Sequence, residues 1–137
     1  MNHPNSNHPN HHNHLDRIRS DLTPLAEDLI ERLVTAGIGI REGVVMTPGE
    51  PPYRRLDCDS RALCYIRVRP KKRAVRVDVS GLWNLRGGIR LTIPGSTGMA
   101  SLMLRTEEDV LETTRYLVEV VVYTRRQYEA EAQRGAA

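Results

Sequence analysis

Two alternating runs on either side of a short basic turn place the strongest constraint on the fold of this chain. Apolar side chains occupy every second position within residues 63–69 and again within residues 73–80. A period of two is typical of strands with one buried face. Because Pro70-Lys71-Lys72 separates the two runs, they predict an antiparallel hairpin with a basic tip.

Further strand signals surround this hairpin between Ile38 and Leu104. Clusters of Gly, Pro, Asp and Ser separate them, and such clusters are typical of turns and loops. We therefore expect a sheet of five or six strands, whose further members lie at residues 38–45, 53–58, 89–93 and 100–104.

Helical patterns lie on both sides of the sheet region. Thr23-Pro24 predicts an N-cap and a first helical position, so a helix is expected over residues 24–36. Residues 15–22 are expected to form a separate helical turn that leads into it. Thr106 is followed by three acidic residues and predicts the start of a second helix, which runs to about Ala132.

These elements predict an α+β fold with an N-terminal helix, an antiparallel sheet and a long C-terminal helix, in two layers with both helices on one face. The expected domain covers residues 15–134, and residues 135–137 are expected to be a flexible C-terminus. Residues 2–14 hold all five histidines and no aliphatic side chain. Such a composition cannot offset the entropy of ordering, so it predicts a disordered tail over residues 1–14.

The histidines of this tail could collect a transition metal adventitiously, because neutral imidazole is a good metal ligand. Their spacing matches no closed zinc site, so we expect no physiological metal site and no cofactor. The histidines concerned are His3, His8, His11, His12 and His14.

The two cysteines indicate a reducing compartment. Cys58 and Cys64 lie six residues apart, outside the spacing of a CxxC motif or a zinc ribbon, and are expected to be free thiols. The sequence has neither the apolar segment of a signal peptide nor a run of about 18 apolar residues that could span a membrane. The expected location is the cytoplasm, without membrane contact.

Charge is divided unevenly along the chain. Residues 51–105 hold 12 basic and 3 acidic residues, whereas residues 15–50 and residues 106–137 each hold 4 basic and 7 acidic residues. The formal net charge of +3 therefore conceals a basic sheet and acidic helices.

Strand alternation predicts where the positive charge lies, because successive side chains point to opposite faces of a sheet. The set expected to face the helices is Ile66, Val68, Val75, Val77, Val79, Leu91 and Ile93. The set predicted to bind nucleic acid is Arg67, Arg69, Arg76 and Arg90 on the opposite face, with Lys71, Lys72 and Arg73 at the hairpin tip.

Contacts to phosphates would relieve the repulsion among these like charges. Tyr65 is expected in the inward register and Trp83 in a loop, so the face would have few aromatic rings for stacking unpaired bases. The set therefore favours a duplex backbone, with little sequence specificity. A solvated sheet face, whose arginines lay their stems over neighbouring residues, stays open as an alternative.

The sequence predicts a protein without catalytic residues. Every histidine lies in the tail, so no Ser-His-Asp or Cys-His site is expected in the folded domain. Asp57 and Asp59 flank Cys58 and could, with Asp78 and a lysine, suggest a metal-dependent nuclease. Their position beside a predicted turn favours turn aspartates.

The hairpin and the last helix together resemble a known family. The stretch CYIRVRPKKRAVRV at residues 64–77, followed by LRTEEDV at residues 104–110, resembles the small YjbR and YdhG-like bacterial domains. The resemblance covers roughly residues 60–128. It implies a compact α+β domain with suspected DNA binding and no known catalytic residues.

We expect a non-enzymatic module whose basic sheet face and hairpin contact a nucleic-acid backbone. The alternative is a protein-interaction or chaperone-like adaptor that dimerises through its C-terminal helix. Type III secretion chaperones have a similar helix-sheet-helix order, although they are typically acidic overall. The residues predicted to bind a protein partner are Trp83, Val118, Val121 and Val122.

Overall fold

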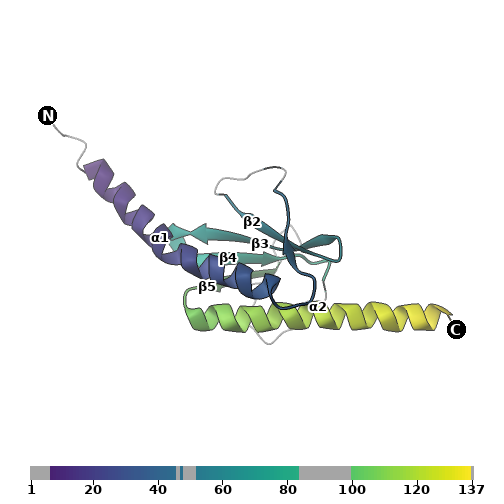
Figure 1. Ribbon diagram of the computed structural model, residues 1–137. Coiled ribbons are helices and arrows are strands. Elements are labelled where there is room, and N and C mark those ends of the chain that lie inside the picture. The colour runs from purple at the N-terminus through teal and green to yellow at the C-terminus, as the bar shows by residue number, and fades with distance from the viewer. Residues whose placement is uncertain (1–6, 46, 48–51, 84–99, 137) are drawn as a thin grey trace.

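The computed structural model describes residues 7–45, 47, 52–83 and 100–136. These residues form an N-terminal helix, a five-stranded antiparallel sheet in the order β1-β2-β3-β4-β5, and a long C-terminal helix (Figure 1). The predicted α+β fold is confirmed. The elements are α1 (Asn7–Val34), β1 (Arg41–Glu42), β2 (Arg54–Cys58), β3 (Arg61–Arg69), the 3-10 helix η2 (Pro70–Lys72), β4 (Ala74–Val79), β5 (Ala100–Leu104) and α2 (Glu107–Ala136).

The predicted hairpin is confirmed as β3, η2 and β4. Pro70 opens the 3-10 turn with its fixed φ, and Arg73 closes it in the left-handed region at φ 51°. β2 and β5 also lie where strands are expected. The strand predicted at residues 38–45 shrinks to β1, since positive φ at Gly39 keeps the preceding chain out of the sheet. The strand predicted at residues 89–93 lies outside the described residues.

The first helix is longer than its cap signals predict. α1 runs without a break from Asn7 to Val34, with Pro24 inside it. Thr23 is therefore not an N-cap, and its hydroxyl instead donates to the carbonyl of Arg19 at 2.7 Å. The prediction of a separate turn over residues 15–22 is wrong, because the buried stripe of α1 continues across the proline and packing outweighs the cap signal. The stripe consists of Leu22, Ala26, Leu29, Ile30 and Leu33.

Both chain ends are more helical than predicted. α1 already includes residues 7–14, which were expected to be disordered, and α2 includes residues 135 and 136 of the predicted flexible C-terminus. Helix propagation explains both differences, because each residue added to an existing helix gains a hydrogen bond without a new nucleation step.

The start of α2 is the predicted one, and a capping box fixes it. The backbone N–H of Asp109 donates to the hydroxyl of Thr106 at 3.1 Å, and the Asp109 carboxylate accepts from the backbone N–H of Thr106 at 3.1 Å. Two helix-terminal donors are thus satisfied reciprocally. Three acidic residues in the first turn add a favourable interaction with the helix dipole.

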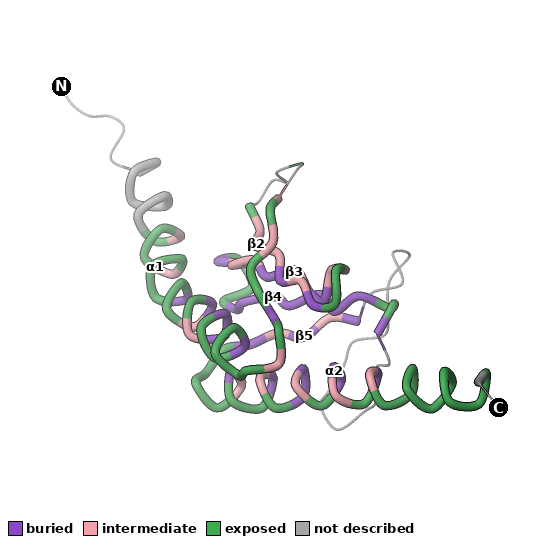
Figure 2. The backbone as a smooth tube through the Cα atoms, turned by 45° about the vertical axis from the view of Figure 1, so that its right-hand side comes forward, coloured by how far each residue is buried: buried purple, intermediate pink, exposed green. Residues whose placement is uncertain are grey.

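One hydrophobic core joins both helices to one face of the sheet. Figure 2 shows buried positions along the strands and on the inner sides of α1 and α2. The C-terminal third of α2 extends past the sheet and is exposed from residue 126 to residue 135 (Figures 1 and 2). The core is mainly aliphatic, and Trp83 and Tyr116 are its aromatic members. Its fully buried side chains include Leu29, Leu33, Leu56, Ile66, Val75, Val77, Val79, Leu104, Val110, Leu117 and Val121.

The β2–β3 turn is tied to α2 by one arginine. Arg125 donates to both carboxylate oxygens of Asp59, at 2.8 and 2.9 Å, and to the carbonyl of Ile38 at 2.6 Å. This hydrogen bonding lowers the pKa of Asp59 and raises that of Arg125. Asp59 and Ser60 both have positive φ, so the predicted turn is confirmed as a tight hairpin turn.

We expect Thr106→Ala to lower the free energy of unfolding by about 1 kcal/mol, because a helix-terminal donor loses its partner. Urea unfolding followed by circular dichroism measures the change. Glu119→Ala, at an exposed position in the middle of α2, is the matched control and should stay within about 0.5 kcal/mol of the wild type. Equal effects of the two changes would contradict the capping role.

Candidate nucleic-acid interface

The side of the sheet turned away from the helices carries a polar surface that we call the outer face. Its members alternate with the buried core positions, and the register places them side by side. Arg67 lies opposite Arg76 in the β3–β4 ladder, and Tyr65 lies opposite Asp78. The outer face consists of Tyr53, Arg55, Asp57, Tyr65, Arg67, Arg69, Arg76, Asp78, Ser101 and Met103.

Two arginines of the outer face are neutralised by neighbouring aspartates. Arg76 donates to Asp78 at 2.9 Å and to the hydroxyl of Ser101 at 3.3 Å. Arg55 donates to Asp57 at 2.6 Å, and this hydrogen bond raises the pKa of Arg55. Arg76 is on the face where the sequence predicts it, but its charge is largely compensated by a carboxylate that is itself almost buried.

Arg67 and Arg69 have no carboxylate partner within the described part of the chain. Arg67 lies directly opposite Arg76 in the ladder, and like charges at opposite positions of a sheet repel each other. Its Nε is buried and finds no acceptor among the described residues, and its guanidinium carbon lies 5.1 Å from the ring centroid of Tyr53. The free positive charge of the outer face is therefore concentrated on β3.

The hairpin tip continues this charge. Lys71 and Lys72 are exposed on η2. Arg73 lies 3.4 Å from the ring of His14 in α1, and Arg105 donates to the carbonyl of Lys72 at 3.3 Å. The tip is thus held from two sides, while its lysine side chains remain free in solvent.

The predicted orientation of Tyr65 is wrong. Tyr65 lies two residues before Arg67 on β3 and therefore points to the same side, the outer face, where it lies opposite Asp78. Its ring meets that of Tyr53 edge to face, with centroids 5.7 Å apart. Tyr53 and Tyr65 thus place two aromatic rings on the same face as Arg67. The expectation of few aromatic rings, which favoured a duplex over a single strand, is therefore not met.

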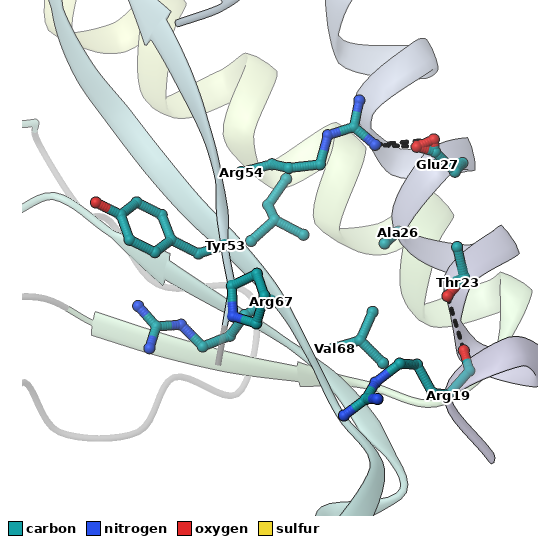
Figure 3. A pocket seen from close by; sticks show the side chains of 10 residues that line it. Arg19, Thr23, Ala26, Glu27, Tyr53, Arg54, Arg67 and Val68 are labelled. Carbon is teal, nitrogen blue, oxygen red and sulfur yellow. Dashed lines mark hydrogen bonds and ion pairs between the residues drawn. The ribbon is translucent and has the colours of Figure 1, made fainter. Parts of the chain in front are cut away.

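A small pocket adjoins the outer face where the β2–β3 ladder stops. The ladder ends at the pair of Arg54 and Ile66, and Pro52, which has no N–H to donate, lies two residues before Arg54. The notch left beside β3 is bounded by α1 and has a volume of about 200 Å³ (Figure 3). We call it the notch pocket; it is lined by Arg19, Thr23, Ala26, Glu27, Pro52, Tyr53, Arg54, Ile66, Arg67 and Val68.

The notch pocket combines an apolar floor with a polar rim. Ala26, Ile66 and Val68 supply the apolar part. On one wall Arg54 forms an ion pair with Glu27 of α1, which bridges the helix to the sheet (Figure 3). Arg54 also forms an ion pair with Glu42 of β1. Arg67 belongs to both the notch pocket and the outer face, so the two surfaces are continuous.

The residues predicted to bind a protein partner are partly core residues. Trp83 is 3% exposed and donates its indole N–H to the carbonyl of Ala62 at 2.8 Å. Val121 is fully buried, because it faces the sheet and the other helix. These two are therefore not available on the surface of a single chain, whereas Val118 and Val122 are half-buried at its margin. Arg90 lies outside the described residues.

The metal-dependent nuclease that the aspartates could suggest finds no support among the described residues. Asp57 is committed to Arg55 and Asp59 to Arg125, so neither offers a free carboxylate. No group of three or more His, Cys, Asp or Glu that could hold a metal occurs among the described residues. In the same part of the chain no helix has the length and apolar character needed to cross a membrane.

Comparison with known proteins gives no relative: no family model, no curated protein and no solved structure matches this chain. The resemblance to the YjbR and YdhG-like domains stays a prediction.

Sequence reasoning missed Tyr53 and the notch pocket. Tyr65 lies two residues before Arg67, and Tyr53 lies two residues before Arg55. Strand alternation from these arginines would have placed both tyrosines on the outer face. The pocket has no comparable signal, because it depends on how α1 crosses the end of β2.

Both cysteines are buried free thiols, as predicted. Burial raises the pKa of Cys58, with the charge of Asp59 adding to the effect, and burial raises that of Cys64 well above its ordinary value. Since the thiolate is the reactive form, we expect the folded protein to be alkylated by iodoacetamide far more slowly than the urea-unfolded chain at pH 8. Mass spectrometry of timed samples measures both rates, and equal rates would contradict the burial.

We expect Arg67→Thr to raise the free energy of unfolding by about 0.5–1 kcal/mol. The change removes the repulsion with Arg76 and a buried donor that has no acceptor in the described part of the chain, and these gains outweigh the lost contact with Tyr53. Urea unfolding at low salt measures the gain. Arg69→Thr is the control, since Arg69 lies opposite Ala74 and its replacement should change stability by less than about 0.5 kcal/mol. A loss of stability in Arg67→Thr would show that Arg67 stabilises the sheet.

Proposed function

We propose that this protein is a non-enzymatic module that binds the phosphate backbone of nucleic acid through its outer face and hairpin tip. One observation carries the proposal: Arg67 and Arg69 are adjacent outward positions of β3, and neither has a carboxylate partner among the described residues. Phosphates are the ligands that planar guanidinium groups bind best, because they accept two parallel hydrogen bonds.

The electrostatic repulsion between opposed arginines on the outer face also supports an anionic ligand. Arg67 directly opposes Arg76, and its buried Nε has no acceptor among the described residues. The two neighbouring outward positions on β4, Arg76 and Asp78, are by contrast paired with each other. A polyanion on the outer face would screen the repulsion between these two arginines. The solvated-face alternative explains the exposed lysines but leaves the opposition of Arg67 and Arg76 uncompensated.

The proposed contact residues differ in how much uncompensated positive charge each supplies. Arg67, Arg69, Lys71 and Lys72 supply free charge, whereas Arg76 brings a charge already shared with Asp78. The protein-interaction alternative has weaker support, because Trp83 and Val121 are buried in the core. A cytoplasmic location fits two reduced thiols and is part of the same proposal.

We expect labelled oligonucleotides to bind with an affinity that falls steeply as salt increases, and Arg67→Gln/Arg69→Gln to weaken binding at every salt concentration. Loss of two phosphate contacts should reduce the log-log salt slope by roughly 1.5. Fluorescence anisotropy over a salt series measures both quantities.

The matched control is Arg115→Gln/Arg126→Gln, which removes the same charge from exposed positions of α2. It should leave the slope close to that of the wild type. Equal weakening by both double variants would mean that net charge alone drives binding, and no binding by the wild type near physiological salt would reject the proposed function.

A further inference from the structure

The notch pocket is a hollow whose shape and surroundings select among polyanions. It lies beside Ile66, Arg67 and Val68 near the end of β3, where the β2–β3 ladder ends at Arg54 and Ile66. Its floor is apolar, and its volume of about 200 Å³ is large enough for one planar ring. An apolar hollow at the edge of a charged surface suits a ligand that is anionic along its length and apolar at intervals.

Two arginines at the mouth of the notch pocket are positioned to bind the anionic groups of such a ligand. Arg67 has no carboxylate partner among the described residues, and Arg19 has only an exposed ion pair of 3.7 Å with Asp16, one turn earlier on α1. These two arginines line the pocket from different elements, as Figure 3 shows. A chain of phosphates passing over the mouth would meet a guanidinium on either side.

The pocket wall also offers partners for a ring. The half-buried Tyr53 stands at the rim with the guanidinium of Arg67 5.1 Å from its ring centroid, and the paired Arg54 and Glu27 present donors and acceptors side by side. Aromatic and guanidinium planes stack on bases of any sequence. A duplex keeps its bases paired inside the helix, so only an unpaired base can reach this hollow.

From this geometry we infer that the ligand is single-stranded nucleic acid, of which one unpaired base enters the notch pocket while the neighbouring phosphates contact Arg67, Arg69 and Arg19. The inference rests on the proposed function and names its ligand class. It replaces the duplex expected from the sequence, because that expectation depended on Tyr65 pointing inward.

The test compares three labelled probes of equal length by fluorescence anisotropy at one salt concentration: a single-stranded oligothymidylate, a duplex, and a single strand whose sugars are abasic. The abasic strand keeps the phosphates and lacks the bases. We expect the single strand to bind at least about tenfold more tightly than the abasic strand, and more tightly than the duplex.

Two variants test whether the difference in affinity between the single strand and the abasic strand arises at the notch pocket. Tyr53→Ala removes the ring at the rim, and Ala26→Leu fills the floor of the notch pocket; each should bring the single strand close to the abasic strand while binding of the abasic strand itself is unchanged. Ala130→Leu, on the exposed end of α2, is the matched control and should change nothing. Circular dichroism melting confirms that each variant is folded, and Tyr53→Ala keeps the test decisive if Ala26→Leu disturbs the core.

The outcomes separate the two claims. Equal binding of all three probes would overturn the inference and leave the proposed function standing, since phosphates alone would then explain the affinity. Competition by polyglutamate as strong as that by the oligothymidylate at equal charge would also overturn it and would indicate an acidic protein partner. Absence of binding to every probe would reject the proposed function itself.

Discussion

Burial of one face of the sheet against both helices is the constraint on which the rest of the structure depends. Ile66, Val77 and Leu102 lie at corresponding positions on three neighbouring strands and are all buried in the core. A shift of one residue would turn these side chains to solvent and bring arginines into the core, so the register is strongly specified. The same register forces Arg67 and Arg76 to share the opposite side. The charged surface is therefore a direct consequence of how the core is formed.

The two surfaces of the sheet differ in how their polar groups are satisfied. On the inner side Arg54 is held by Glu27 and Glu42, which ties α1 to the strands. On the outer side the aspartates neutralise Arg55 and Arg76, whereas Arg67 and Arg69 have no carboxylate partner among the residues that the structure describes. A bound anion would screen the opposition of Arg67 and Arg76 and would thereby stabilise the folded state by mass action.

The sequence predicted those features that depend on short-range periodicity. The β3–β4 hairpin, the start of α2 and the outward set of Arg67, Arg69 and Arg76 all follow from alternation or from a cap within four residues. The continuity of α1 through Pro24 could not be predicted in this way, since it depends on packing against strands far along the chain. The notch pocket and the burial of Trp83 likewise depend on how distant segments pack together. The error on Tyr65 was different, because strand alternation alone places Tyr65 on the same face as Arg67.

The packing of α1 against α2 makes completion of the domain depend on elements from opposite ends of the fold. α2 supplies Val110, Leu117 and Val121 to the same core cluster as Leu29 and Leu33 of α1, and it follows all five strands in the chain. During synthesis on a ribosome, the valine-rich side of the sheet therefore stays partly uncovered until α2 has emerged. Contacts between such distant segments also make folding slow relative to a helical bundle of equal length. The nascent chain thus passes through a stage in which its apolar sheet surface is open to chaperones.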